Sequence, residues 1–333
     1  MQVYIKAISY YLPKNVITNA ELAKIFPEWT EEKIAKKLGI LERHVTAEDE
    51  TASDMAVAAA EKLFSEHGID KGSIDYLIFC TQSADYVLPT TACLIQNRLG
   101  LNDTIGAVDL NLGCSGWIFG LSMAKGLIAG GMASNVLLLT AETYSKYMHP
   151  KDKGNRTIFG DGAAATLVST QGIAEIGNFS FGTDGEGAKN LIVRTGGARC
   201  RKSKNDLVFD DFGNPKSSDY LYMNGTEILN YTLDRIPTLI EDVLKKNSVS
   251  IENIDLHVYH QANKYIANLQ RVKMKIPVEK YYCCFENMGN TVSSTIPIAL
   301  CEALKDGTIQ QGMKVLSVAQ GLGYSWGGVM MKF

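Results

Sequence analysis

The sequence predicts an α/β protein that is built from two similar halves. The first observation is a set of short apolar runs with the length of buried strands, at residues 74–79, 136–140, 257–259 and 315–318. Continuous apolar strands indicate a sheet that is covered on both faces. The second observation is that patterns with helical spacing, at residues 53–67 and 227–246, alternate with these runs. Strands that alternate with helices are typical of layered α/β proteins.

The third observation is an internal resemblance between the halves. Residues 68–79 and 249–259 each contain a helix end, a short turn and a buried strand. The strands at 136 and 315 are each followed by a glycine-rich turn and another strand. This repeat is too long for a solenoid, so we predict a duplicated unit with domains 1–170 and 171–333. The polar residues 196–214 are expected to form a long surface loop.

Composition excludes several classes of protein. A chain of 333 residues can bury a large core without disulfides or a structural metal. Hydrophobic residues at 46% and charged residues at 21% are ordinary for a globular protein and exclude a disordered or collagen-like chain. The 33 Lys and Arg against 36 Asp and Glu give a net charge of −3, which argues against nucleic acid as a partner.

Cysteine usage and hydropathy indicate a reduced cytoplasmic protein. The seven cysteines are scattered and include no Cys-x-x-Cys, so neither a disulfide framework nor a metal site is indicated. The N-terminus lacks the basic-then-apolar plan of a signal peptide. No apolar run reaches the ~18 residues that a membrane span needs, so no membrane association is expected.

Cys114 is the first candidate for chemistry. It lies between an apolar strand at 105–110 and a helix predicted over 118–129, with glycines on either side. The positive end of a helix dipole lowers the pKa of a thiol from about 8.5 and favours the thiolate. A buried, inert cysteine is the alternative interpretation.

His260 and Asn290 are candidate partners, because a cysteine nucleophile needs a base or a hydrogen-bonding group. His260 follows the strand at 257–259, and strand ends in α/β sheets are where side chains meet ligands. Asn290 lies in a Gly-Asn-Thr turn. A core histidine and a turn-forming or helix-capping asparagine are the alternatives. The order Cys, His, Asn along a duplicated α/β chain is stronger evidence for a catalytic site than any one of the three residues alone.

At these residues the sequence resembles the β-ketoacyl-acyl-carrier-protein synthase III family of the thiolase superfamily. The resemblance spans nearly the whole chain, with motifs at Tyr11-Leu12-Pro13, 39–44, 88–92, Gly113-Cys114-Ser115-Gly116, 159–163, His260-Gln261-Ala262-Asn263, Gly289-Asn290-Thr291 and Ser325-Trp326-Gly327. It implies a five-layered αβαβα thiolase-like fold made of two duplicated halves, and a homodimer.

The resemblance also implies a decarboxylative condensation that initiates fatty acid biosynthesis. Cys114 would take an acyl group from coenzyme A as a thioester, and His260 and Asn290 would polarise the malonyl thioester of an acyl carrier protein. The resulting enolate would attack the acyl-Cys114 thioester, whose oxyanion would be held by the amides of Cys114 and Leu322. No metal and no cofactor beyond the coenzyme A thioester are implied.

Several substrate positions depart from the family pattern. Lys33 and Lys37 replace the tryptophan and arginine that bind the nucleotide of coenzyme A, and Lys153 replaces another arginine at that end. The other departures are Thr226 for an asparagine at the pantetheine arm, Leu88 for a phenylalanine that reaches across the dimer, and Gln320 where an aromatic ring usually packs. The acyl donor can therefore differ from that of the fatty-acid enzymes.

A basic patch is the predicted docking site for the carrier protein. Lys264 takes the place of an arginine that helps to dock the carrier, and Arg271, Lys273 and Lys275 follow it. An ordinary solvated helix face is the alternative interpretation of these charges.

Three other functions are weighed against condensation. An acyltransferase of a specialised pathway would pass the acyl group from Cys114 to an alcohol or amine. A non-catalytic partner subunit would have no need of Cys114, His260 and Asn290. Hydroxymethylglutaryl-CoA synthase needs a glutamate base where this chain has Gln82, and an amide cannot take up a proton.

Overall fold

The computed structural model describes residues 1–333 and contains one nine-stranded mixed sheet with the order β13-β14-β15-β8-β1-β7-β6-β4-β5. The strands are β1 (Tyr4–Tyr11), β4 (Tyr76–Cys80), β5 (Gly106–Leu110), β6 (Asn135–Glu142), β7 (Gly162–Ser169), β8 (Ala174–Thr183), β13 (Leu256–Tyr259), β14 (Lys314–Gly321) and β15 (Ser325–Lys332). Pairing between β1 and β8 is limited to Tyr4 with Glu175 and Ile5 with Ala174. The sheet therefore consists of two groups of strands that meet at one end.

The two groups repeat one pairing pattern. In the first, β5, β4 and β6 are parallel, and β7 and β1 continue antiparallel. In the second, β13 and β14 are parallel, and β15 and β8 continue antiparallel. A single parallel bridge from His257 to Tyr281 lies beside β13, where the first group has β5 beside β4. The boundary at residue 170 stays a prediction; it falls in the turn between β7 and β8.

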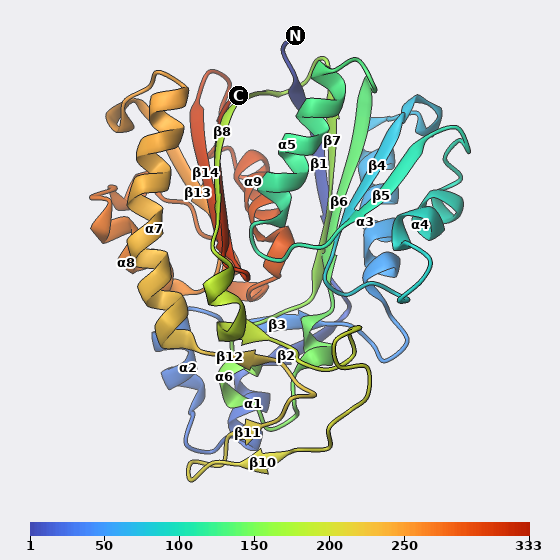
Figure 1. The fold of residues 1–333 in the computed structure, drawn as a ribbon. Helices are drawn as coiled ribbons and strands as arrows, with labels where there is room; N and C mark the ends of the chain where they lie inside the picture. The colour runs from blue at the N-terminus through green and yellow to red at the C-terminus, as the bar shows by residue number, and fades with distance from the viewer.

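The helices complete five layers (Figure 1). Helices α5 (Gly116–Ala129) and α9 (Thr295–Lys305) lie between the two groups of strands. Helices α3 (Ala52–His67) and α4 (Thr91–Leu99) cover the outer face of the first group. Helices α7 (Gly225–Lys246) and α8 (Lys264–Lys273) cover the outer face of the second. The predicted αβαβα arrangement of two duplicated halves is confirmed.

Three large apolar cores fill the space between the layers. The central core is built around α5, whose Trp117, Ile118 and Leu121 are buried. A second core lies under α3 and a third under α7. Helix α3 begins at a capping box formed by Thr51 and Asp54, which satisfies amides that the first turn leaves free.

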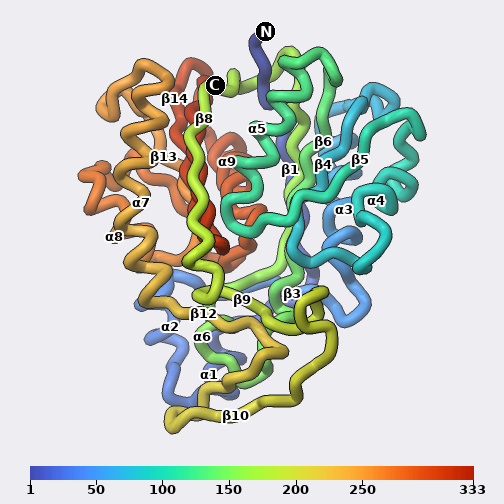
Figure 2. Tube along the Cα trace, in the orientation of Figure 1, coloured from blue at the N-terminus to red at the C-terminus, as the bar shows by residue number.

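The remaining α-helices and strands form a cap at one end of the layers (Figures 1 and 2). They are β2 (Asn15–Thr18), α1 (Asn19–Ile25), α2 (Glu31–Leu38), β3 (Glu42–Val45), α6 (Lys153–Arg156), β9 (Leu191–Ile192), β10 (Val208–Phe209), β11 (Pro215–Lys216) and β12 (Tyr222–Met223). Segments far apart in the sequence meet there, since Lys153 contacts Glu28 at 2.8 Å and the carbonyl of Phe212 at 3.2 Å.

The predicted elements differ from the observed ones mainly at their ends. Helix α5 begins two residues earlier than predicted, and β14 extends beyond the predicted run at 315–318 to Gly321. The predicted loop at 196–214 contains one two-residue strand, β10. None of the helices combines the length and the apolar character that a membrane crossing needs.

Candidate active site

Cys114, His260 and Asn290 line one cavity of about 160 Å³. Cys114 comes from the turn between β5 and α5, His260 follows β13, and Asn290 lies in the turn before α9. Leu322, from the turn between β14 and β15, lines the same cavity. The fold therefore brings together the four residues that the sequence predicts for the reacting centre.

Close backbone contact fixes the position of Cys114. A Cβ atom added at Gly321 would lie 3.2 Å from both the Cβ and the amide nitrogen of Cys114. A side chain at Gly321 would push the two turns apart, so glycine is needed for this approach. On the other side, the hydroxyls of Ser115 and Ser325 lie 2.7 Å apart. These contacts join the two halves of the chain at the candidate nucleophile.

The predicted lowering of the pKa of Cys114 is wrong. Burial raises its pKa to about 12, and the negative charge of Glu142 adds to this effect. Cys114 lies two residues before the start of α5, but desolvation of a charged sulfur outweighs the helix dipole. At neutral pH the resting side chain is therefore a thiol.

Glu142, at the end of β6, is a buried carboxyl that the sequence analysis missed. Burial raises its pKa to about 8. The amide of Gln82 and the hydroxyls of Ser83 and Ser293 donate hydrogen bonds to it. Glu142 is therefore a source of negative charge near Cys114 whose ionisation changes close to neutral pH.

His260 is a neutral imidazole in the cavity wall. Burial lowers its pKa to about 3. Its Nδ1 atom lies 2.7 Å from Oγ1 of Thr295, which also lies 3.1 Å from the carbonyl oxygen of Val292. Because a hydroxyl carries one hydrogen, Thr295 controls which ring nitrogen of His260 bears the proton.

The orientation of the Asn290 carboxamide is set by its neighbours. The Val292 amide donates a 2.9 Å hydrogen bond to Oδ1 of Asn290, so the Nδ2 donor end remains for the cavity. The preceding Gly289 has φ +71, and a Cβ there would lie 3.0 Å from Cβ of Arg43 and from the carbonyl oxygen of Ile158. The turn thus needs glycine both for its conformation and for its packing.

Cys114 and Leu322 each bring a backbone amide to the lining of the cavity. Neither amide takes part in a turn or loop hydrogen bond. The Leu322 carbonyl accepts a 2.9 Å bond from the Ser325 hydroxyl, which fixes the turn. Two amides that donate to no backbone carbonyl, in residues that line one cavity, are suited to stabilise an oxyanion.

The predicted substrate-binding residues lie outside this cavity. Lys37 is exposed, and its Nζ lies 4.9 Å from the ring centroid of Trp29. Lys153 is ion-paired with Glu28. Thr226 is exposed in the first turn of α7, next to Gly225 in the cavity lining, and Leu88 is 83% exposed on a loop after β4.

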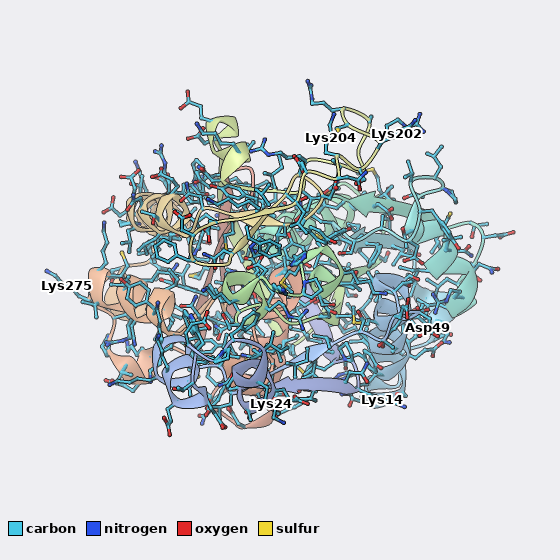
Figure 3. The ribbon with its side chains drawn as sticks, turned by 90° about the horizontal axis from the view of Figure 1, so that it is seen from below. Lys14, Lys24, Asp49, Lys202, Lys204 and Lys275 are labelled. Atoms are coloured by element: carbon cyan, nitrogen blue, oxygen red, sulfur yellow. The ribbon has the colours of Figure 1, made fainter.

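The predicted docking residues are not equivalent to one another. Lys264, Lys273 and Lys275 are exposed at α8 and the turn after it, and Lys275 projects away from the body of the molecule (Figure 3). Arg271 is half-buried and donates a 3.1 Å hydrogen bond to the carbonyl of Ile276. Arg271 is therefore partly used to close the end of α8.

The rest of the cavity wall was not predicted from the sequence. Ile228, Tyr231 and Thr232 line it from the first two turns of α7, and Ile266 lines it from α8. Residues at i, i+3 and i+4 share one helix face. The spacing of Ile228, Tyr231 and Thr232 in a predicted helix could therefore have indicated that they line one wall. Thr295 offered no such signal, because its contact with His260 depends on the packing of α9.

Comparison with known proteins identifies the family. Residues 108–185 match the family described as 3-oxoacyl-[acyl-carrier-protein (ACP)] synthase III, and residues 244–333 match its C-terminal region. The chain is 35% identical over 323 residues to a β-ketoacyl-[acyl-carrier-protein] synthase III of Clostridium perfringens, covering 97% of this chain and 96% of that protein. The chain belongs to the β-ketoacyl-[acyl-carrier-protein] synthase III family.

Other synthase III proteins agree with this assignment over the full length. The protein of that name from Fusobacterium nucleatum is 33% identical, covering 99% of this chain and 98% of its own. A crystal structure described as 3-oxoacyl-(acyl-carrier-protein) synthase III is 47% identical, with a TM-score of 0.98 and full coverage of both chains. The synthase III structure from Aquifex aeolicus is 32% identical with a TM-score of 0.86, covering 99% of this chain and 100% of that one.

Proposed function

We propose that this acyltransferase condenses an acyl-CoA primer with malonyl-acyl-carrier protein through a thioester on Cys114. Membership of the synthase III family supports the reaction class. The observation that carries the assignment of roles is the convergence of Cys114, His260 and Asn290, from three distant segments, on one cavity. No metal and no cofactor other than the coenzyme A thioester enters the proposed reaction.

In the first step, the sulfur of Cys114 attacks the carbonyl carbon of the acyl thioester. The bond from that carbon to the sulfur of coenzyme A breaks, and the proton of the Cys114 thiol goes to the departing sulfur. The amides of Cys114 and Leu322 stabilise the oxyanion, which the free state of both amides supports. The N-terminus of α5 stabilises the sulfur only as negative charge develops on it, since the resting group is a thiol.

In the second step, His260 and Asn290 donate hydrogen bonds to the carbonyl oxygen of the malonyl thioester. Carbon dioxide leaves, and the electron pair of the broken bond forms an enolate whose oxygen the two donors stabilise. The enolate carbon attacks the acyl-Cys114 carbonyl, and the sulfur of Cys114 leaves and regains a proton. Occupation of Oδ1 of Asn290 by the Val292 amide supports Nδ2 as the donor.

Thr295 acts on this step as a positioning residue. If its hydroxyl hydrogen is donated to Nδ1 of His260, the ring proton is on Nε2, where it can be donated to the substrate. The 2.7 Å distance between Oγ1 and Nδ1 allows this arrangement, which requires the Thr295 hydroxyl to turn its hydrogen from the Val292 carbonyl, 3.1 Å away, to Nδ1. The low pKa of His260 agrees with a neutral donor and not with an imidazolium.

The cap binds the nucleotide end of coenzyme A in this proposal. Trp29 offers an aromatic ring, and the ammonium groups of Lys33 and Lys37 lie 5.3 and 4.9 Å from its centroid. Lys153 adds a third cation nearby through its contact with Glu28. Stacking on the ring and attraction of the lysines for phosphate would serve the two parts of a nucleotide. Thr226, next to Gly225 in the cavity lining, is the proposed contact of the pantetheine arm.

The protein is proposed to act as a cytoplasmic homodimer that receives malonyl groups from an acyl carrier protein. Strand β5 is an unpaired edge of the sheet. In the loop that precedes α4, Tyr86, Val87 and Leu88 are 63–90% exposed. An open edge and exposed apolar side chains favour association. The exposed lysines Lys264, Lys273 and Lys275 are the proposed contacts of the acidic carrier, and Arg271 contributes less because it is half-buried.

The test is product formation from acetyl-CoA and longer acyl-CoAs with malonyl-carrier protein, followed by release of carbon dioxide and by mass spectrometry of the carrier. Wild-type protein should form a 3-oxoacyl carrier, and the Cys114→Ala variant should not. Cys283→Ala is the matched control, because Cys283 is exposed and outside the cavity. Acyl transfer to an added amine or alcohol, without carbon dioxide release, would instead favour the specialised acyltransferase.

A further inference from the structure

Gln320 is a buried amide at the end of an apolar row on β14. Leu316 and Val318 are fully buried in the core under α7. Side chains two residues apart on a strand point to the same face, so Gln320 continues this row. It is only 5% exposed.

The amide oxygen of Gln320 has no partner within the protein. Its Oε1 atom is buried and accepts no hydrogen bond. Buried polar side chains in folded proteins are nearly always paired, because desolvation without a hydrogen bond is unfavourable. The unpaired oxygen of Gln320 therefore suggests a hydrogen-bond donor that the free protein does not contain.

The position of Gln320 indicates the source of that donor. It lines the cavity together with Cys114, His260 and Asn290. The next residue, Gly321, packs directly on Cys114. The side chain of Gln320 thus borders the space in which the thioester reacts, and a rotation of its amide would bring the enclosed Oε1 atom to a bound substrate. Neither step described above uses this amide.

We propose that Gln320 is a specificity-determining residue whose amide oxygen accepts a hydrogen bond from an N–H or O–H group of the substrate. The proposal rests on the proposed function, because it takes this cavity as the place where thioesters react. Two parts of a substrate can supply such a donor. One is the amide N–H of the pantetheine arm, which every coenzyme A thioester carries, and the other is a hydroxyl or amino group on the acyl chain.

The experiment compares acyl-enzyme formation from butanoyl-CoA and 3-hydroxybutanoyl-CoA in wild-type protein and in the Gln320→Met and Gln320→Glu variants. Methionine keeps the unbranched shape and removes the amide, whereas glutamate keeps an acceptor oxygen at the same length. If the acyl chain supplies the donor, wild-type protein prefers the hydroxylated substrate by about ten-fold, and only methionine abolishes this preference. If the pantetheine arm supplies it, methionine lowers kcat/KM for both substrates equally.

Equal kcat/KM values for wild type and Gln320→Met with both substrates would overturn the proposal. Circular dichroism and melting temperature check the fold, and the methionine variant should melt at the same temperature or higher because it loses an unpaired buried oxygen. Failure of the proposed function would appear differently, since wild-type protein would then form no acyl-enzyme with any donor.

Discussion

The floor and the rim of the site hold their polar groups in different ways. At the floor, Cys114, His260 and Asn290 are buried, and backbone or hydroxyl contacts orient the imidazole and the carboxamide. At the rim, Lys37 is exposed and Lys153 is paired with an exposed glutamate. Buried groups with fixed partners can stabilise a developing charge without reorganising, whereas exposed cations contribute mainly to attraction and are screened by salt.

This difference sets the expected size of each mutational effect. Changes at the floor should alter chemical steps, and changes at the rim should alter substrate affinity.

Removal of the nucleophile should have the largest effect. Cys114→Ala should lower condensation by roughly a thousand-fold or more, because no other group in the cavity can form the thioester. Steady-state kinetics with acyl-CoA and malonyl-carrier protein measure this. Retention of a tenth of wild-type activity would mean that Cys114 is not the nucleophile and would revive the non-catalytic scaffold.

Replacement of Asn290 should separate the two steps. Asn290→Asp keeps the acceptor for the Val292 amide but loses the Nδ2 donor, so condensation should fall by about 100- to 1000-fold. Acyl-enzyme formation, measured by intact mass, should stay close to the wild-type rate. An equal loss in both steps would show that Asn290 supports the cavity as a whole.

The Thr295→Val substitution should have an intermediate effect. Valine matches the shape of threonine but leaves Nδ1 of His260 without its hydroxyl partner. We expect decarboxylation to fall by about ten-fold, the cost of one lost hydrogen bond in the cavity. A shifted pH profile for decarboxylation would accompany a change of tautomer, and an unchanged profile and rate would remove Thr295 from the mechanism.

The pH dependence of Cys114 reactivity should depend on Glu142. With a pKa of about 12, the thiolate fraction should keep increasing from pH 6 to 9, by less than ten-fold per unit near pH 8 where Glu142 gains its charge, without levelling off at the ordinary thiol value of about 8.5. Glu142→Gln removes the negative charge, so it should lower the pKa and speed alkylation by iodoacetamide several-fold at pH 8. Peptide mapping assigns the alkylated site, and slower alkylation in the variant would contradict the stated electrostatic effect.

The smallest effect is expected at the rim. Lys153→Ala should raise the KM for acyl-CoA by only about two- to five-fold and leave kcat unchanged, because Lys153 is already paired with Glu28 and lies outside the cavity that holds Cys114. The difference should shrink as salt is raised. A fall in kcat would place Lys153 with the floor and break the distinction between the two regions.

The same contrast explains how much could be predicted from the sequence. Cys114, His260 and Asn290 stand beside strand ends and glycine turns, which local patterns reveal, and the alternation of strands and helices predicts the layers. The pKa of Cys114 could not be predicted in this way, because burial and the charge of Glu142 are products of tertiary packing. The contact of Lys37 with Trp29 likewise depends on the orientation of the Trp29 ring, which lies just before α2 and whose direction no local pattern gives.

The most direct test of the account is intact-mass spectrometry of the purified protein after incubation with acetyl-CoA and a series of longer acyl-CoAs. The account predicts one acyl adduct, mapped to the peptide that contains Cys114, which persists in Asn290→Asp and is absent from Cys114→Ala. If no acyl-CoA gives an adduct, repetition with acyl-carrier protein as the donor distinguishes a requirement for that donor from an unreactive Cys114. An adduct on another cysteine, or none from either kind of donor, would contradict the account.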